Sequence, residues 1–268
     1  MYKGLITEDM TKCHKLCLEL LKESHVLIAG TTGSGKSVLM NSMIYTAMRM
    51  AVDKLYFIDL KQTEMRPYKK LYNCAWHCTR REMVIPLLSR VVRDMNKRFG
   101  KMRGKMYDGE PTYIFIDEIA HLVNDTDRKF NKAVLDLLVQ IGRLGRAANI
   151  HLICATQDPS RKTLCAQLMQ NFTCTIALRC RSSIESRQIV GVAGAEELPR
   201  YGKGIMWNAE GITTVDIPLT PEKDIERMAK AMSVLGETIA HFSMMLKHKL
   251  YVVDEDYEAR LDRGLATW

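Results

Sequence analysis

The sequence has no long hydrophobic run. No stretch of its 268 residues approaches the roughly 18 consecutive apolar residues that a membrane-spanning helix requires. It also lacks a secretory signal, an internal repeat and a low-complexity segment. These absences argue against a membrane-spanning protein and a repeat architecture. Without a signal, the eight cysteines are expected to be reduced thiols in the cytoplasm.

What is present fits a globular protein, with 47% hydrophobic and 26% charged residues. The length suits one large domain with a substantial core. The net charge is +8, and the excess of basic residues is unevenly distributed. The stretch from Lys61 to Lys105 contains thirteen Lys or Arg but only three acidic residues. This basic stretch either meets phosphates or forms a solvated helix face.

Two cysteine pairs raise the alternative of a zinc site. Each pair is spaced by four, with a histidine nearby: Cys13, Cys17 and His14, then Cys74, Cys78 and His77. Zinc sites usually space paired ligands by two to four and show a clear second pair. Cys154, Cys174 and Cys180 lie in apolar runs and are expected in the core.

Strand-like and helix-like patterns alternate along the chain. Strands are expected at 25–30, 54–60, 112–116, 151–155, 173–178, 204–207 and 213–217. Helices are expected at 38–50, from a capping box at Thr79–Glu82, at 130–144, at 163–172 and from Thr220 as cap with Pro221 following. Pro86 predicts that the second helix is kinked or begins later. The pattern indicates a three-layer α/β fold with a mainly parallel central sheet.

A phosphate-binding loop follows the first strand. The motif G-x-x-x-x-G-K-[ST] is complete and opens a helix, as its chemistry requires. Glycines let backbone N–H groups turn toward a phosphate, and the helix N-terminus adds positive charge. Lys36 is expected to reach the β- and γ-phosphates of ATP, and Ser37 to help hold Mg²⁺. The predicted nucleotide-binding residues are Gly30, Thr31, Thr32, Gly33, Ser34, Gly35, Lys36, Ser37 and Val38.

Two carboxylates end the strand at 112–116. Asp117 is expected to hold Mg²⁺, and Glu118 to orient or deprotonate the attacking water. A polar turn is the simpler alternative, but the phosphate-binding loop favours catalysis. Gln157 ends another apolar strand, and we expect it in the same crevice, where an amide contacts the γ-phosphate or the water. Arg143 and Arg146 lie just upstream of that strand.

Several linked motifs resemble the FtsK/SpoIIIE family of DNA translocases. They include LIAGTTGSGKSVLMN from Leu27, Ile58-Asp-Leu-Lys61, Ile116-Asp-Glu-Ile-Ala, and GRAANIHLICATQDPS from Gly145. SRQIV from Ser186 and Gly194-Ala-Glu-Glu complete the series, which runs from about His25 to Ile217. The resemblance implies a RecA-like motor fold and a ring, usually a hexamer. Such a ring threads double-stranded DNA through its pore and hydrolyses ATP at subunit interfaces.

The resemblance also implies roles for individual residues. Lys36, Ser37, Asp117, Glu118 and Gln157 carry over with the roles given above. Arg187 stands where the family places an arginine that acts across the interface, with Arg143 and Arg146 as weaker candidates. Asp158 stands where the family usually has a basic residue. Candidate DNA contacts are Arg161, Lys162, Arg200 and Lys203; the alternative for each is a solvated loop.

The sequence resembles a stripped motor core of the kind found in plasmids, phages and integrative conjugative elements. The expected division is a lead-in helix at 1–24, a motor ATPase domain at 25–232 and a tail at 233–268. The preferred function is an ATP-driven double-stranded DNA translocase. One alternative is a conjugation or secretion coupling ATPase that moves a relaxase–DNA complex or a protein. The other is a nucleotide-gated, DNA-binding scaffold with little turnover. A relaxase, membrane anchor or loading protein is an expected further partner.

Overall fold

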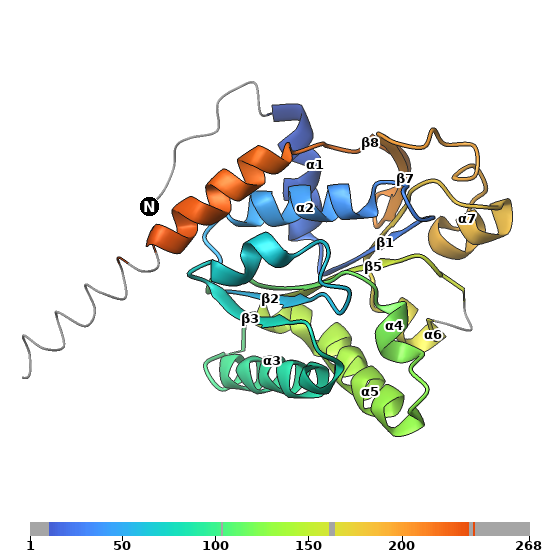
Figure 1. Ribbon diagram of the computed structural model, residues 1–268. Coiled ribbons are helices and arrows are strands. Elements are labelled where there is room, and N and C mark those ends of the chain that lie inside the picture. Colours follow the sequence, from blue (N-terminus) through green and yellow to red (C-terminus); the bar gives the residue numbers. More distant parts are fainter. Residues whose placement is uncertain (1–10, 103, 161–163, 236–237, 239–268) are drawn as a thin grey trace, which may run out of the picture.

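The computed structural model describes residues 11–102, 104–160, 164–235 and 238. Its centre is an eight-stranded sheet in the order β3-β2-β4-β5-β1-β6-β7-β8 (Figure 1). The first six of these run parallel to one another, and β7 pairs antiparallel with both β6 and β8. The strands are β1 (His25–Ala29), β2 (Lys54–Ile58), β3 (Cys74–Cys78), β4 (Thr112–Ile116), β5 (Ile150–Thr156), β6 (Cys174–Ala177), β7 (Lys203–Asn208) and β8 (Gly211–Asp216).

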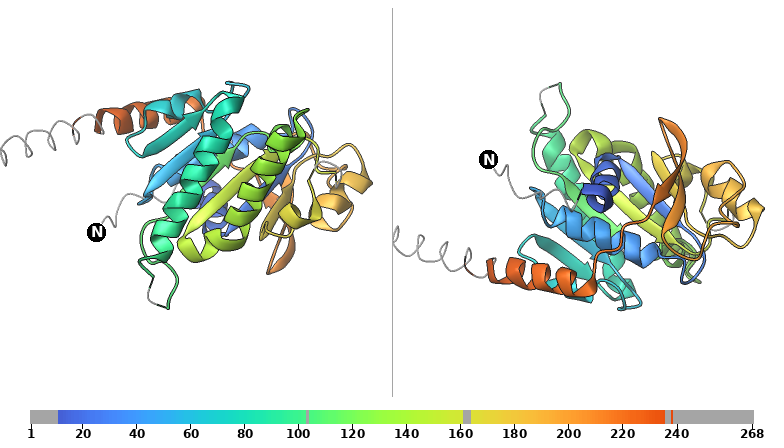
Figure 2. Two further views of the ribbon diagram at one scale, coloured as in Figure 1. Left: turned by 90° about the horizontal axis from the view of Figure 1, so that it is seen from below. Right: turned by 90° about the horizontal axis from the view of Figure 1, so that it is seen from above.

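Helices cover both faces of the sheet (Figure 2). The α-helices are α1 (Thr11–Lys22), α2 (Lys36–Ala47), α3 (Val84–Phe99), α4 (Ala120–Val123), α5 (Arg128–Leu144), α6 (Ala166–Met169), α7 (Ser183–Val190) and a last helix that occupies residues 222–235. Short 3₁₀ turns are Arg66–Lys70, Arg81–Met83 and Gly145–Ala148. This is the three-layer α/β fold that the alternating pattern predicts.

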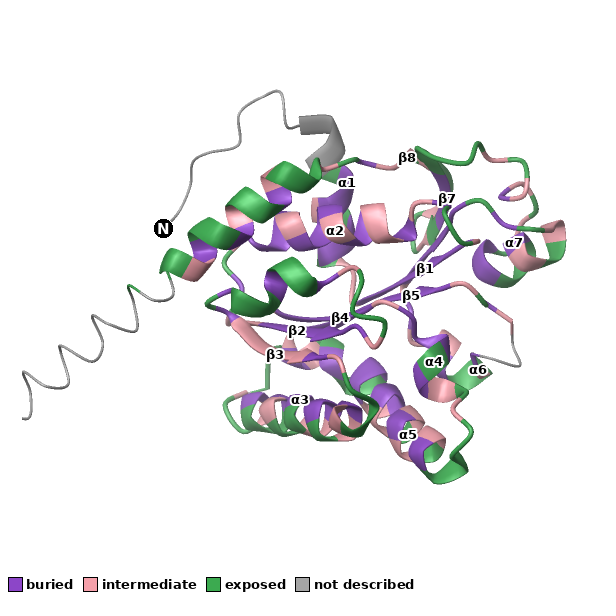
Figure 3. Ribbon diagram, in the orientation of Figure 1, coloured by how far each residue is buried: buried purple, intermediate pink, exposed green. Residues whose placement is uncertain are grey.

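Side chains alternate between the two faces of the sheet along each strand, so an apolar core lies on each face. In β1, Val26 and Ile28 face the layer formed by α1, α2 and the 222–235 helix, whereas Leu27 faces α3 and α5. Successive side chains of a strand point to opposite faces, so a strand buried on both sides reads as a continuous apolar run. Figure 3 shows the buried strands between helices whose outer faces are exposed.

Some element boundaries differ from the sequence prediction. The helix expected from Thr79 begins at Val84 after a 3₁₀ turn, and no side chain caps it. Pro86 therefore lies in its first turn, where the missing N–H costs nothing. The helix expected at 163–172 is reduced to α6, within the described residues. Thr220 does not cap the last helix; its hydroxyl hydrogen-bonds Ser42 Oγ at 2.9 Å.

Strand β3 is missing from the sequence prediction. Its residues, Cys74–Cys78, include a tryptophan and a histidine, and four of the five are only half-buried. An edge strand of this kind shows neither a continuous apolar run nor clean alternation. It pairs in parallel with β2, with a register shift between Leu55 and Tyr56.

Part of the basic stretch forms an exposed helix surface. Arg90, Arg93 and Lys97 are exposed on α3. Arg98, by contrast, is buried and donates to Asp53 at 2.8 Å and to Thr112 Oγ1 at 2.6 Å. Buried arginines need such pairing, because an unpaired interior charge is very costly. This part of the basic excess thus stabilises the fold.

Within the described residues, no cluster of three or more His, Cys, Asp or Glu side chains could hold a metal ion. Cys74 and Cys78 lie at opposite ends of β3, and the side chains of Cys13 and His14 lie outside the description. No described helix combines the length and apolar character needed to cross a membrane. Most of the 233–268 tail also lies outside the described residues, so the division at 24 and 232 stays a prediction.

Candidate nucleotide-binding site

The carboxyl ends of the parallel strands meet at one edge of the sheet, where α/β proteins bind their ligands. The loop after β1 carries the G-x-x-x-x-G-K-[ST] motif, Asp117 directly follows β4, and Gln157 directly follows β5. Strand β5 lies between β1 and β4. A pocket of about 370 Å³ opens here, lined by Thr32, Gly33, Gly35, Lys36, Ser37, Val38, Lys61, Thr63, Glu64, Asp117, Gln157 and Tyr201.

Glycines shape the loop for two different reasons. Gly33 and Gly35 have φ angles of 73° and 99°, which side chains rarely adopt. Gly30 is limited by space, because a Cβ atom there would lie 2.7 Å from Ser34 Oγ and 3.0 Å from Leu178 Cβ. The backbone of Thr31 donates to Arg179 O at 2.9 Å, which ties the loop to the chain beyond β6. The hydrogen bond at Thr31 and the close packing at Gly30 therefore fix the loop before helix α2 begins at Lys36.

Lys36 points back into the loop. Its Nζ donates to the carbonyl oxygens of Gly30 and Thr31, both at 2.8 Å. The side chain is buried, and this burial lowers the pKa of Lys36 despite the nearby Glu118 and Asp117 carboxylates. A largely desolvated ammonium group inside a loop of backbone N–H donors is suited to binding the phosphates of a nucleotide.

Asp117 lies in an acidic neighbourhood. Burial, followed by the charges of Asp59 and Glu64, raises the pKa of Asp117 to about 6. Asp59 ends β2, and its Oδ2 accepts the backbone N–H groups of Glu64 at 3.1 Å and Met65 at 3.0 Å. A cation beside a carboxylate that is surrounded by other acids stabilises the charged form of that carboxylate.

The pocket offers donors of the kind that Mg²⁺ prefers. The Ser37 hydroxyl and the Asp117 carboxylate line the same pocket. Mg²⁺ binds hard oxygen ligands and usually keeps waters and substrate phosphates as further ligands, so two protein oxygens suffice. The residues present thus fit the ion that the sequence implies.

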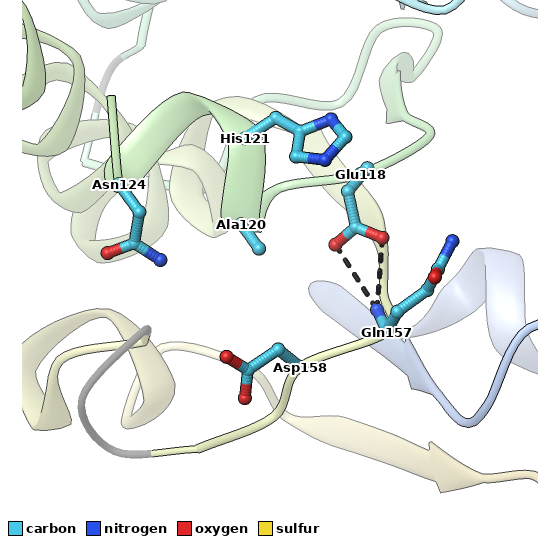
Figure 4. Close-up of a pocket in the computed structure, with 6 residues that line it drawn as sticks. All are labelled: Glu118, Ala120, His121, Asn124, Gln157 and Asp158. Carbon is cyan, nitrogen blue, oxygen red and sulfur yellow. Dashed lines mark hydrogen bonds between the residues drawn. The ribbon is translucent and has the colours of Figure 1, made fainter. Parts of the chain in front are cut away.

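Glu118, Gln157 and Thr32 form a chain of contacts across the site. The backbone N–H of Gln157 donates to both oxygens of Glu118, at 3.0 and 3.2 Å (Figure 4). The Gln157 side chain accepts a hydrogen bond from Thr32 Oγ1 at 2.8 Å. Glu118 is buried and fixed, and Gln157 connects it to the phosphate-binding loop. Gln157 lines the same pocket as Lys36 and Asp117, and its backbone contacts Glu118 beside that pocket.

A second hollow of about 380 Å³ lies beside Glu118. Figure 4 shows His121 of α4 and Asn124, which follows α4, on one side and Asp158 on the other. Asp158 is exposed, and its Oδ1 accepts the backbone N–H of Ser160 at 3.0 Å. Glu118 therefore lines a hollow other than the nucleotide pocket.

The candidate arginines lie apart from the pocket of their own chain. Arg187 is exposed in the last turn of α7 and donates to Ser183 Oγ at 3.4 Å. Arg143 and Arg146 are also exposed, but they precede β5 and so lie at the opposite, amino-terminal edge of the sheet. None of the three lines the nucleotide pocket.

The four candidate DNA-contacting residues differ in where the structure places them. Arg161 and Lys162 lie outside the described residues. Lys203 forms an ion pair with Asp216, its partner in register across β7 and β8, at 2.8 Å. Arg200 lies against the phosphate-binding loop, because a Cβ atom on Gly33 would be 3.3 Å from its Nη2.

Sequence analysis missed four residues that line the pocket. Lys61, Thr63 and Glu64 come from the loop after β2, and Tyr201 precedes β7. The first three had a usable signal. Asp59 ends an apolar strand just as Asp117 does, and the ends of parallel strands converge. Tyr201 had none, because nothing in its local pattern relates it to a loop so distant in sequence.

Comparison with known proteins identifies relatives of the chain. The FtsK/SpoIIIE family profile matches residues 2–109. The DNA translocase FtsK of Chlorobaculum tepidum is 31% identical over 219 residues, which cover 72% of this chain and 27% of that protein. The DNA translocase SftA of Bacillus subtilis is 32% identical over 211 residues, covering 70% of this chain and 21% of that protein. The chain thus spans about a quarter of the length of these relatives.

Solved structures share the fold. The pCW3 conjugation coupling protein TcpA, in a monomer form with ATPγS, superimposes with a TM-score of 0.67 at 22% identity, covering 79% of this chain and 66% of that one. The cytoplasmic domain of the Thermomonospora curvata type VII secretion ATPase EccC gives 0.64 at 23% identity, covering 79% and 28%. With the pocket and the motifs described above, these relationships show that the chain is similar to the FtsK/SpoIIIE family and has the fold of a P-loop ATPase.

Proposed function

We propose that this chain is the motor domain of an ATP-driven double-stranded DNA translocase. The observation that carries the proposal is the meeting of Lys36, Asp117, Glu118 and Gln157 around one edge of the sheet. These groups supply what phosphoryl transfer needs, namely charge stabilisation and a positioned water. DNA as the cargo is supported by the relatives, which are named DNA translocases.

The residues divide the chemistry among themselves. Lys36 and the loop N–H groups bind the β- and γ-phosphates, and Ser37 and Asp117 hold Mg²⁺, which neutralises developing charge when bound. Glu118 takes a proton from the attacking water. Gln157 contacts both Glu118 and Thr32, so it couples the state of the phosphate-binding loop to the position of the base.

We further propose that the active form is a hexameric ring in which Arg187 acts on the neighbour's nucleotide. Arg187 is exposed and lies outside its own pocket, as an arginine acting across an interface must. Such an arginine stabilises charge in the transition state. The proposed setting is the cytoplasm, with a membrane anchor, relaxase or loading protein as a further partner.

ATP turnover with and without duplex DNA, measured across a salt series, tests the proposal. We expect DNA to stimulate hydrolysis and the stimulation to decline as salt rises, because phosphate contacts release counterions. The Lys36→Ala variant provides the baseline. Stimulation by a partner protein but not by DNA would indicate a coupling ATPase instead. Nucleotide binding without turnover under any condition would indicate the scaffold alternative.

A further inference from the structure

The segment 199–202, just before β7, lies at the rim of the nucleotide pocket. Tyr201 lines that pocket together with Thr32, Gly33 and Gly35 of the phosphate-binding loop. Its side chain is 59% exposed, so the ring is accessible at this rim. The carbonyl of Gly202 accepts the backbone N–H of Ile217 at 2.9 Å, which anchors the segment to the chain after β8. An accessible aromatic ring is thus held at a fixed place beside the loop.

Arg200 brings a positive charge to the same place. Its Nη2 and Nε would lie 3.3 and 3.9 Å from a Cβ atom on Gly33, so the guanidinium covers this exposed glycine of the loop. The guanidinium carbon is also 5.2 Å from the centre of the Tyr201 ring. Within the described part of the chain, no acidic side chain forms an ion pair with Arg200. Its charge is therefore available to an anion bound by the loop.

We infer that Arg200 and Tyr201 form a nucleotide-recognition element, in which Arg200 binds the phosphates beside Gly33 and the Tyr201 ring stacks on the nucleobase. Aromatic rings stack on bases of any identity, and an arginine donates strong hydrogen bonds to phosphate oxygens. The inference rests on the proposed function, because it assumes that the pocket takes a nucleoside triphosphate. It assigns Arg200 to the nucleotide, whereas sequence analysis assigns it to DNA.

Two probes separate the roles of the residues. ATP carries both a base and a triphosphate, whereas inorganic tripolyphosphate carries only the phosphates. We expect Tyr201→Ala to weaken ATP binding about tenfold, the equivalent of losing one stacked base, and to leave tripolyphosphate binding unchanged. Arg200→Ala should weaken both ligands by about tenfold, as expected for one charged hydrogen bond. Tyr201→Phe keeps the ring and should bind ATP as the unmodified protein does.

Titration calorimetry of the full chain with each probe measures these affinities. Matched controls are Tyr72→Ala, which removes an exposed aromatic ring elsewhere, and Arg93→Ala, which removes an exposed charge on α3. Unchanged ATP affinity in Arg200→Ala and Tyr201→Ala would overturn the inference. So would equal weakening of ATP and tripolyphosphate by Tyr201→Ala, or loss of DNA stimulation with unchanged ATP affinity.

The failure of this inference differs from the failure of the proposed function. If the unmodified protein hydrolyses ATP in response to DNA while both variants bind ATP normally, only the recognition element is wrong. If both variants lose affinity as expected while DNA never stimulates turnover, the element stands and the translocase proposal fails.

Discussion

The backbone N–H of Gln157 donates to both carboxylate oxygens of Glu118, while the side chain of the same glutamine accepts a hydrogen bond from Thr32. One residue at the end of β5 therefore contacts both the proposed base and the phosphate-binding loop. If Thr32 moves when nucleotide binds, its hydrogen bond to the Gln157 side chain changes. Gln157 can then shift, and Glu118, which accepts the Gln157 N–H, can shift with it. This connection gives the site a physical means of matching the base to the presence of nucleotide.

Glu118→Gln should bind ATP but hydrolyse it very slowly. The glutamine oxygen can still accept the Gln157 N–H, so the local fold is retained, but a neutral amide cannot take a proton from water. We expect turnover to fall by about 100- to 10,000-fold, the usual contribution of a general base. ATP affinity by calorimetry and turnover by phosphate release measure the two effects.

The control for this variant is Asn124→Ala, which changes an exposed residue of the same hollow beside Glu118. Its turnover should stay close to that of the unmodified protein. Normal turnover in Glu118→Gln would show that another group activates the water.

Gly30→Ala should destabilise the protein. The new methyl group would lie 2.7 Å from Ser34 Oγ and 3.0 Å from Leu178 Cβ, so the loop or β6 end must shift. Overpacking of this kind costs about 1–3 kcal/mol of unfolding free energy. Urea unfolding measures the loss, and ATP affinity should fall with it because the loop carries the phosphate donors.

Gly100→Ala is the matched glycine control. Gly100 has a helical φ of −63°, and its nearest neighbour to an added Cβ would be 3.6 Å away. Alanine there should be neutral or stabilise the protein by about 0.4–1 kcal/mol. Equal effects at the two positions would show that crowding at Gly30 is unimportant.

The buried His25 side chain should make the folded protein less stable in acid. Burial, followed by the neighbouring His151, lowers the pKa of His25 to about 3 in the folded protein, against about 6.5 in an unfolded chain. Above pH 6.5 both states are neutral and nothing is lost. Between pH 6.5 and 3 the unfolded chain binds a proton that the folded one does not, so stability falls by about 1.4 kcal/mol per pH unit.

His25→Asn isolates this contribution, since its Oδ1 can accept the Leu152 N–H that His25 Nδ1 accepts at 2.9 Å and it does not titrate. Urea unfolding between pH 7.5 and 5.5 should show a loss about 1.4 kcal/mol smaller in the variant. Parallel curves for the two proteins would rule out His25 as a source of the acid sensitivity. His151, whose pKa burial also lowers, remains in both.

Local sequence signals predicted most of the sheet and eight of the twelve residues that line the pocket. The apolar runs of β1, β4 and β5 are buried on both faces, so their lengths and ends could be read directly. The polar residues that follow them converge because parallel strands share an edge. Lys36, Asp117, Glu118 and Gln157 were therefore predictable together.

The positions of Arg200 and Tyr201 at the pocket depend on tertiary contacts. Arg200 and Tyr201 come to Gly33 because β6 and β7 extend the sheet beside β1, and an arginine in a polar loop carries no local mark of that neighbour. Strand β3 was missed because an edge strand is half-buried and its pattern is weak. Both features were missed because segments distant in sequence determine the environment of these residues.

Mixed assemblies test the proposed action of Arg187 across a subunit interface. Arg187→Ala keeps an intact nucleotide pocket, and Lys36→Ala keeps the arginine, so each alone should lose activity, the former by about a thousandfold. Mixing them should restore hydrolysis at interfaces that pair an intact pocket with an intact arginine. Mixing Arg187→Ala with the double variant, which has neither group, should restore none. Activity that fails to reappear in the first mixture, measured as DNA-stimulated phosphate release, would place the role of Arg187 within its own subunit, where its position on α7 leaves it outside the pocket.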